Sequence, residues 1–160
     1  MTIRSAAKAA IISGDKILLQ CCVDTDTGFD YYELPGGGQN PQETMEAALV
    51  RECLEETGYH VEIVRFLAVG EEIITIESVN REFPDHAHRA FHIFLCKIKA
   101  LPREAPTEED AQQVDIRWFP LSDAPKLRLR PTNLRAALLP LLESGEIGYL
   151  GTSILDTFNT

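Results

Sequence analysis

Three glutamates in one short segment are the residues of this chain that most clearly suggest chemistry. Glu52, Glu55 and Glu56 recur at spacings of three and four, which places them on one face of a helix. Their like charges repel, and two of them lie near the helix C-terminus, where the helix dipole favours cations. A divalent cation would relieve both effects, because Mg²⁺ and Mn²⁺ prefer oxygen ligands. Without such an ion, the three glutamates form a solvated acidic surface.

A glycine-rich loop and an arginine favour a cation site over a solvated acidic surface. The loop, residues 34–38, reads Leu-Pro-Gly-Gly-Gly and precedes the acidic helix. Glycines allow backbone groups to approach a phosphate or a metal closely. Arg51 lies four residues before Glu55 and can orient its carboxylate through a charge-assisted hydrogen bond.

Local signals define the ends of this helix, which we expect over residues 41–57. Asn40 is a favourable N-cap, Pro41 suits the first helical position, and Glu43 completes a capping box. Gly58 is expected to end the helix. We expect a packing face roughly opposite the glutamates, formed by Ala47, Val50 and Leu54.

The complete spacing resembles the Nudix box, here residues 37–59. That box is a glycine, five residues, Glu, seven residues, Arg-Glu, an aliphatic position, one residue, Glu-Glu, one residue, a glycine and an aliphatic position. Cys53 and Tyr59 occupy the two aliphatic positions, and residues 117–121 resemble the family's late strand. The resemblance covers residues 5–142. Its seven fixed positions are all matched, by Gly37, Glu43, Arg51, Glu52, Glu55, Glu56 and Gly58.

The resemblance implies a fold and a reaction. The fold would be an α/β (α+β) Nudix sandwich, a mixed β-sheet flanked by helices, with the box as loop–helix–loop. The enzyme would be a metal-dependent pyrophosphohydrolase that cleaves a nucleoside diphosphate linked to another group X by water attack on phosphorus. Glu52, Glu55, Glu56 and the Gly36 carbonyl would hold Mg²⁺ or Mn²⁺.

The resemblance also suggests catalytic and supporting roles. Glu55 or Glu56 is a candidate general base, and Arg51 would orient the glutamates. Glu43 either caps the helix or supports the glutamates, and Gly58 ends the helix. The base can also come from outside the box, where the candidates are Glu71, Glu72, Glu82, Glu108, Glu109 and Asp110.

The substrate stays open at this point. Gly37 and Gly38 are expected to contact phosphate, Tyr32 or one of its aromatic neighbours Phe29 and Tyr31 to stack on a base, and Arg89 to bind phosphate. The family's marks for ADP-ribose and for dinucleoside polyphosphates are replaced by Ile74 and Thr75, so X could also be a nucleotide sugar or the rest of a nucleoside triphosphate. His86, His88 and His92 suggest exposed or substrate-contacting side chains more than a zinc site, because no suitably spaced fourth ligand follows.

Composition limits the class of protein. The chain has 160 residues, a formal charge of −10 and 44% hydrophobic residues, which fits one domain over residues 1–160 and not a disordered tail. The acidic charge argues against binding a nucleic acid polymer, and no segment resembles a membrane span or a signal peptide. The four cysteines form no CxxC pair, so we expect free thiols in a cytoplasmic protein whose partner is a small nucleotide.

The remaining elements are expected to position the box. Residues 5–13 and 16–22 read as a hairpin around Gly14-Asp15, and further strands are predicted over 31–34, 59–69, 71–78, 89–99 and 114–119. Residues 79–88 and 101–113 read as loops. A C-terminal helix is predicted over about 131–143. The tail, 145–160, packs either on its own domain or across a homodimer.

Two other functions are compatible with a Nudix-like fold. One is a nucleotide-sensing module without catalysis, although such modules often lose the box glutamates that this chain keeps. The other is an enzyme like isopentenyl diphosphate isomerase, which normally carries additional cysteine and histidine metal chemistry that we do not find in this sequence.

Overall fold

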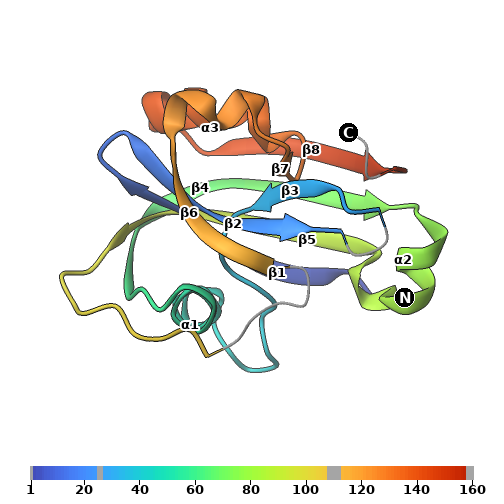
Figure 1. Cartoon of the computed structure of the whole chain (residues 1–160), viewed down its shortest axis with the longest axis horizontal. Coiled ribbons are helices and arrows are strands. Elements are labelled where there is room, and N and C mark those ends of the chain that lie inside the picture. Colours follow the sequence, from blue (N-terminus) through green and yellow to red (C-terminus); the bar gives the residue numbers. More distant parts are fainter. Residues whose placement is uncertain (1, 25–26, 108–112, 158–160) are drawn as a thin grey trace.

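The computed structural model describes residues 2–24, 27–107 and 113–157, which form strands and helices in a regular order along the chain (Figure 1). The strands are β1 Arg4–Ser13, β2 Lys16–Val23, β3 Asp30–Glu33, β4 Val61–Ile74, β5 His88–Ile98, β6 Gln113–Pro120, β7 Leu129–Arg130 and β8 Gly148–Leu155. The helices are α1 Met45–Thr57, α2 Glu77–Glu82 and α3 Leu134–Ser144, with 3-10 turns η1 Pro84–His86 and η2 Leu121–Lys126.

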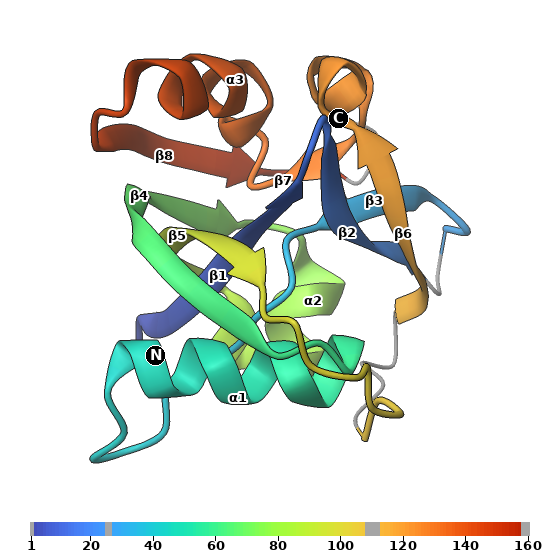
Figure 2. The same ribbon diagram turned by 90° about the vertical axis from the view of Figure 1, so that its left-hand side faces the viewer.

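The strands form a mixed sheet between two helices, which confirms the predicted α/β/α architecture. The order is β7-β3-β2-β1-β5-β4-β8, with β6 also paired to β2. Figure 2 shows α1 on one side of the strands and α3 on the other. Among the described residues, no helix is long and apolar enough to cross a membrane. All four cysteines are buried free thiols, as expected.

Strand β1 separates two hydrophobic clusters because successive side chains of a strand point to opposite faces. Ala6 and Ala10 belong to the cluster that also contains Leu134 and Leu138 of α3. Ala7, Ala9 and Ile11 belong to the cluster that contains Leu49 and Cys53 of α1. Each helix therefore buries its apolar side against one face of the same strand.

The predicted hairpin forms, but its two strands soon separate. Ile12 pairs with Ile17 and Ser13 with Lys16, and Gly14 adopts a φ of +59° in the turn. Beyond these pairs β1 runs parallel to β5, whereas β2 pairs with β3 and β6. Side chains of β1 and β5 on one side of this separation, and of β2 and β3 on the other, line one hollow.

The segment 71–88 differs from the prediction of a strand followed by a loop. β4 is one continuous strand to Ile74, because its backbone pairs with β5 on one side and with β8 on the other. Pairing ends after Thr75, whose N–H donates to the Leu155 carbonyl at 2.8 Å. The chain then forms α2 and η1, which bury none of their residues.

The C-terminal region is more ordered than its sequence indicated. Helix α3 begins at Leu134, three residues later than predicted, because residues 131–133 form a turn. The predicted tail forms β8 over Gly148–Leu155, parallel to β4. The described part of the tail therefore docks on its own sheet.

Candidate active site

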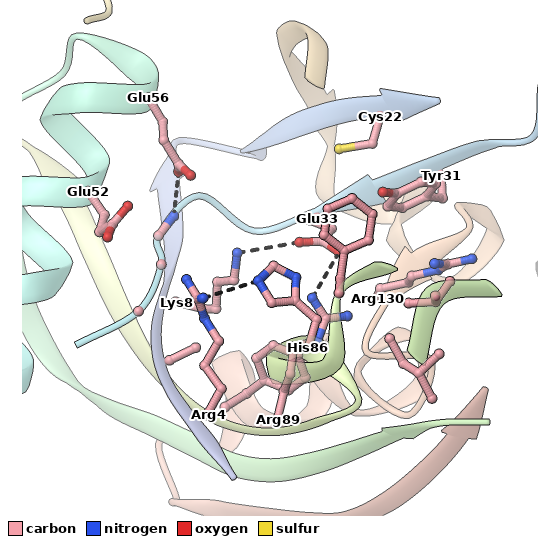
Figure 3. A pocket seen from close by; sticks show the side chains of 18 of the residues that line it. Arg4, Lys8, Cys22, Tyr31, Glu33, Glu52, Glu56, His86, Arg89 and Arg130 are labelled. Carbon is pink, nitrogen blue, oxygen red and sulfur yellow. Dashed lines mark hydrogen bonds and ion pairs between the residues drawn. The ribbon is translucent and has the colours of Figure 1, made fainter. Parts of the chain in front are cut away.

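A cavity of about 600 Å³ lies between the glycine loop, α1 and the sheet. Figure 3 shows two glutamates of α1, Glu52 and Glu56, on one side and Tyr31 and Arg130 on the opposite side. The charged side chains that line the cavity are Arg4, Lys8, Glu33, Glu52, Glu56, Arg89 and Arg130. Charged residues from five separate parts of the chain therefore meet in one hollow.

The glycine loop is fixed along β1 by backbone hydrogen bonds. Ala9 N–H donates to the Pro35 carbonyl at 2.8 Å, and Ala7 N–H donates to the Gly37 carbonyl at 2.9 Å. Gly36 has a φ of +119°, and a Cβ there would collide with the Ala7 carbonyl oxygen. A Cβ at Gly37 would collide with the Glu52 carboxylate. Glycine at these two positions therefore permits close contact between β1, the loop and α1.

Helix α1 begins later than the sequence indicated. Its N-cap is Thr44, whose Oγ1 accepts a hydrogen bond from Ala47 N–H at 3.1 Å, and not Asn40. Asn40 still shares one capping-box bond with Glu43, from its own N–H to Glu43 Oε2 at 3.0 Å. The intervening Gln42 has a φ of +67°, which is incompatible with a right-handed helix. Gly58 ends the helix as predicted, with a φ of +70°.

The buried face of α1 is not the one that we predicted. Ala47 is exposed, whereas Ala48, Leu49, Cys53, Glu56 and Thr57 are buried. The other two predicted packing residues, Val50 and Leu54, are half-buried, and Val50 packs against the cluster on the α1 side. The helix is turned so that one of the three glutamates, Glu56, faces the protein interior.

Glu56 is a buried carboxylate at the cavity wall. Its Oε2 accepts a hydrogen bond from Gly36 N–H at 2.8 Å, and the Gln20 side chain also hydrogen-bonds to it. Burial raises the pKa of Glu56 to about 7, although Lys8 and the hydrogen bonds act in the opposite direction and Glu52 adds to the increase. The group can therefore gain or lose a proton near neutral pH.

Arg51 holds the other carboxylates of the box in a network. Its Nε and Nη2 donate to the two oxygens of Glu43 at 2.8 and 3.0 Å. Its Nη1 donates to Glu52 at 2.8 Å and to Glu55 at 2.9 Å, and Nη2 also reaches the Gly38 carbonyl at 3.1 Å. The hydrogen bond from Arg51 lowers the pKa of Glu43 to about 2. Arg51 thus joins the glycine loop to three glutamates, and Glu43 supports Arg51.

The three predicted metal ligands are not equivalent. Glu52 and Glu56 line the cavity, but Glu55 does not and is held by Arg51. Within residues 2–24, 27–107 and 113–157, no three His, Cys, Asp or Glu side chains are arranged to hold a metal ion. The described residues therefore contain no preformed cage of three carboxylates.

The donors that do face the cavity still suit a hard divalent cation. Mg²⁺ is usually bound by one or two carboxylates together with water and substrate phosphates, not by a complete protein cage. Glu52, Glu56 and the backbone of Gly36 all line the cavity and offer oxygen atoms. A cation beside Glu56 would also offset the unfavourable burial of its charge.

A second charged group also lines the cavity, and two of its members, Lys8 and Glu33, were missed by sequence reasoning. Lys8 Nζ lies 3.4 Å from Glu33 Oε2, and Arg89 Nη1 lies 3.8 Å from Glu33 Oε1. Burial opposes the charged form of Glu33, but Lys8, Arg89 and Arg130 outweigh it and lower its pKa. Arg89, a predicted phosphate ligand, also donates to buried Glu72 at 2.5 Å. Lys8 lies in an apolar strand and carries no motif, so only the fold could identify it.

The predicted aromatic contact shifts by one residue. Tyr31 lines the cavity, with the Arg130 guanidinium 4.1 Å from its ring centroid. Tyr32 points to the α3 side, where its ring packs against the Phe119 ring with the two centroids 5.0 Å apart. Alternation along β3 explains the exchange, because neighbouring side chains of a strand face opposite ways. Phe83 and Phe91 complete an aromatic lining.

The three predicted bases outside the box that the structure describes do not line this cavity. Glu71 accepts from Thr152 Oγ1, Glu72 is paired with Arg89, and Glu82 is exposed on α2. The other three candidates, Glu108, Glu109 and Asp110, lie outside the described residues.

The three histidines do not gather into one site. His86 lines the cavity and lies 3.1 Å from Arg4, measured from Nε2 to Nη1. His88 and His92 lie on β5, where the His92 ring packs against Phe66.

Comparison with known proteins agrees with this fold and site. The chain matches the family model of the NUDIX domain over residues 2–141. It is 29% identical over 133 residues to a Mus musculus protein named diphosphoinositol polyphosphate phosphohydrolase 3-alpha, covering 82% of this chain and 71% of that protein. It resembles the structure of a NUDIX hydrolase from Nitrosomonas europaea (TM-score 0.69, 19% identity, 90% of each chain covered).

A second solved structure is similar in both fold and sequence. It is a MutT NUDIX hydrolase from Burkholderia pseudomallei, with a TM-score of 0.63 and 27% identity over 86% of this chain and 98% of that one. The family match covers most of the chain and includes the complete box. The protein therefore belongs to the Nudix family and is a hydrolase that acts on pyrophosphate bonds.

Proposed function

We propose that this enzyme hydrolyses a nucleoside diphosphate linked to a group X, and that it needs Mg²⁺ or Mn²⁺ to do so. The observation that carries the proposal is the convergence of Glu52, Glu56 and the glycine loop on one cavity whose far wall is aromatic. The first side suits a metal-bound diphosphate, and the second suits a flat base.

Glu52 and Glu56 would hold the cation, with the Gly36 carbonyl as a third donor. When bound, the ion would lower the pKa of water and neutralise charge on the phosphoryl oxygens. Glu55 does not line the cavity, so we assign it a smaller role. Arg51 and Glu43 are positioning residues, because they act through the carboxylates that they hold.

Glu56 is the general base that the geometry supports best. Its carboxylate lines the cavity together with Glu52 and can accept the proton of an attacking water. Gly36 N–H fixes one of its oxygens. Lys8 Nζ would stabilise the negative charge that develops on the phosphoryl group.

The charge of the cavity bears on the identity of X. Arg4, Lys8, Arg89 and Arg130 face four carboxylates, namely Glu33, Glu52, Glu56 and the Glu72 that pairs with Arg89. The four positive charges are thus matched by four negative ones. The charge of one bound divalent ion would then suit a diphosphate better than a highly phosphorylated ring. We therefore favour a nucleotide substrate over the diphosphoinositol polyphosphates named for the mouse relative.

A hydrolysis screen tests the proposal. Nucleoside triphosphates, ADP-ribose, nucleotide sugars and dinucleoside polyphosphates would be incubated with Mg²⁺ or Mn²⁺, in isotopically labelled water that marks the attacked phosphorus. We expect metal-dependent turnover that falls by about a hundredfold or more in Glu56→Gln. Glu46→Gln, an exposed position on the same helix, is the matched control. Equal activity with and without metal, or full activity in Glu56→Gln, would contradict the proposal.

A further inference from the structure

A second hollow lies just outside the cavity. We call it the outer groove, an open hollow of about 820 Å³. We propose that it binds the group X when X is an uncharged, hydroxyl-bearing group such as a hexose; this rests on the proposed function. The groove is lined by Thr2, Ile3, Arg4, Ser5, Gly38, Gln39, Asn40, Pro41, Gln42, Glu52 and Asp85.

The groove and the cavity share one wall. Arg4, Gly38 and Glu52 line both hollows. Arg4 crosses between them to approach His86 at 3.1 Å, and its guanidinium packs over Gly38, where a Cβ would lie 2.8 Å from Nη2. A diphosphate held by a cation at Glu52 could therefore extend in two directions, one into the cavity and one into the groove.

The two hollows differ in chemistry, which assigns a direction to each half of the substrate. The cavity side offers the rings of Tyr31, Phe83 and Phe91. None of the residues that line the groove is aromatic. A base that gains from stacking belongs in the cavity, and X is left to the groove.

The groove favours hydroxyl groups over anions. Asn40 and Gln42 are exposed there, and each amide both donates and accepts hydrogen bonds, as a sugar hydroxyl does. Glu52 and Asp85 make the groove acidic, whereas its one cation, Arg4, already approaches His86. A further phosphate at this position would be repelled, but an uncharged polyol would not.

The backbone at Gln42 supports this assignment. Its φ of +67° is a left-handed conformation that residues with a side chain rarely adopt. Such strain is typical of positions that a function has fixed. A glutamine stands there on the lining of the groove, although a glycine would fit the backbone better.

The test compares two substrates that share the same base and differ in X. One is a nucleoside diphosphate hexose and the other is the nucleoside triphosphate. We expect the ratio of kcat/KM, hexose over triphosphate, to fall about tenfold in Gln42→Gly and to fall similarly in Asn40→Ala. Glycine accepts the left-handed backbone, so Gln42→Gly is expected to fold.

Phe83→Ala is the matched control, because it alters the cavity side. We expect it to weaken both substrates together and to leave the ratio unchanged. If the wild type cleaves the triphosphate but not the hexose compound, or if Gln42→Gly and Asn40→Ala leave the ratio unchanged, the groove assignment is wrong while the proposed function stands. If the wild type cleaves no nucleotide at all, the proposed function fails and the groove assignment with it.

Discussion

A single buried carboxylate, Glu56, should control how stability depends on pH. Its folded-state pKa of about 7 lies above its ordinary value of 4.5, so the folded protein keeps a proton that the unfolded chain releases. In the metal-free protein we therefore expect the free energy of unfolding to fall as pH rises from 4.5 to about 7, by roughly 3 kcal/mol. Urea unfolding in EDTA at several pH values measures this.

Glu56→Gln is the comparison for that experiment, because it removes the titrating group and keeps the shape. Glu43 has the opposite shift, to a pKa of about 2, so its contribution is present above pH 4.5 and is lost as pH falls towards 2. The two effects occupy separate pH windows. Equal slopes for wild type and Glu56→Gln between pH 4.5 and 7 would show that Glu56 is not the group responsible.

Arg51→Lys tests the network that holds the box glutamates. Lysine cannot make the paired hydrogen bonds to Glu43 and reach two further carboxylates at once. We expect activity at fixed Mg²⁺ to fall about 10–100-fold and the half-saturating Mg²⁺ concentration to rise. Arg65→Lys is the control, because Arg65 donates only to backbone carbonyls of Phe66, Leu141 and Glu146. An unchanged Mg²⁺ requirement would limit Arg51 to a purely structural role.

At the scale of single elements, the start of α1 can be tested by two substitutions. Thr44→Ala removes the side-chain oxygen that caps the helix, so we expect a loss of about 1 kcal/mol of unfolding free energy. Asn40→Ala should change stability by less than about 0.5 kcal/mol, because only its backbone takes part in the capping bonds. Denaturant unfolding measures both losses. A larger loss in Asn40→Ala than in Thr44→Ala would show that the Asn40 side chain is the N-cap.

Two helix-ending glycines form a second matched pair. Gly58 and Gly145 have nearly equal φ values of +70° and +72°. A Cβ at Gly145 meets open space, whereas one at Gly58 would collide with the Glu104 carbonyl. We expect Gly145→Ala to cost about 1 kcal/mol and Gly58→Ala about 2–4 kcal/mol, measured by urea unfolding. Equal losses would mean that the Glu104 backbone moves aside at little cost.

Elements encoded by adjacent residues could be predicted from the sequence, and those that depend on distant contacts could not. The β1–β2 hairpin, the glycine loop and the end of α1 at Gly58 follow from local signals. The burial of Glu56 was not predicted, because it depends on contacts with Gly36 and Gln20, which are distant in the sequence. Lys8 and Glu33 were missed for the same reason, since only the sheet brings them together.

At the scale of the whole molecule, charge distribution predicts which ligands are excluded. The chain carries a formal charge of −10, and two cations of its cavity, Lys8 and Arg89, are already paired with carboxylates. Without metal, we expect an inositol polyphosphate to bind at least about tenfold more weakly than a nucleoside diphosphate. Equilibrium binding titrations in EDTA measure both dissociation constants. Tight binding of the inositol compound would instead favour a substrate like that of the mouse relative.

The strand pairing also decides when during synthesis the enzyme can first work. Strand β2 needs β6, since Lys16 pairs with Pro120, and the cavity needs Arg130 from β7. Contacts between residues so distant in sequence close large loops and slow folding. A ribosome that has released only the glycine loop and α1 therefore carries the complete box in a nascent chain without its opposite wall. The cavity is therefore complete only after Arg130, in the last quarter of the chain, has left the ribosome.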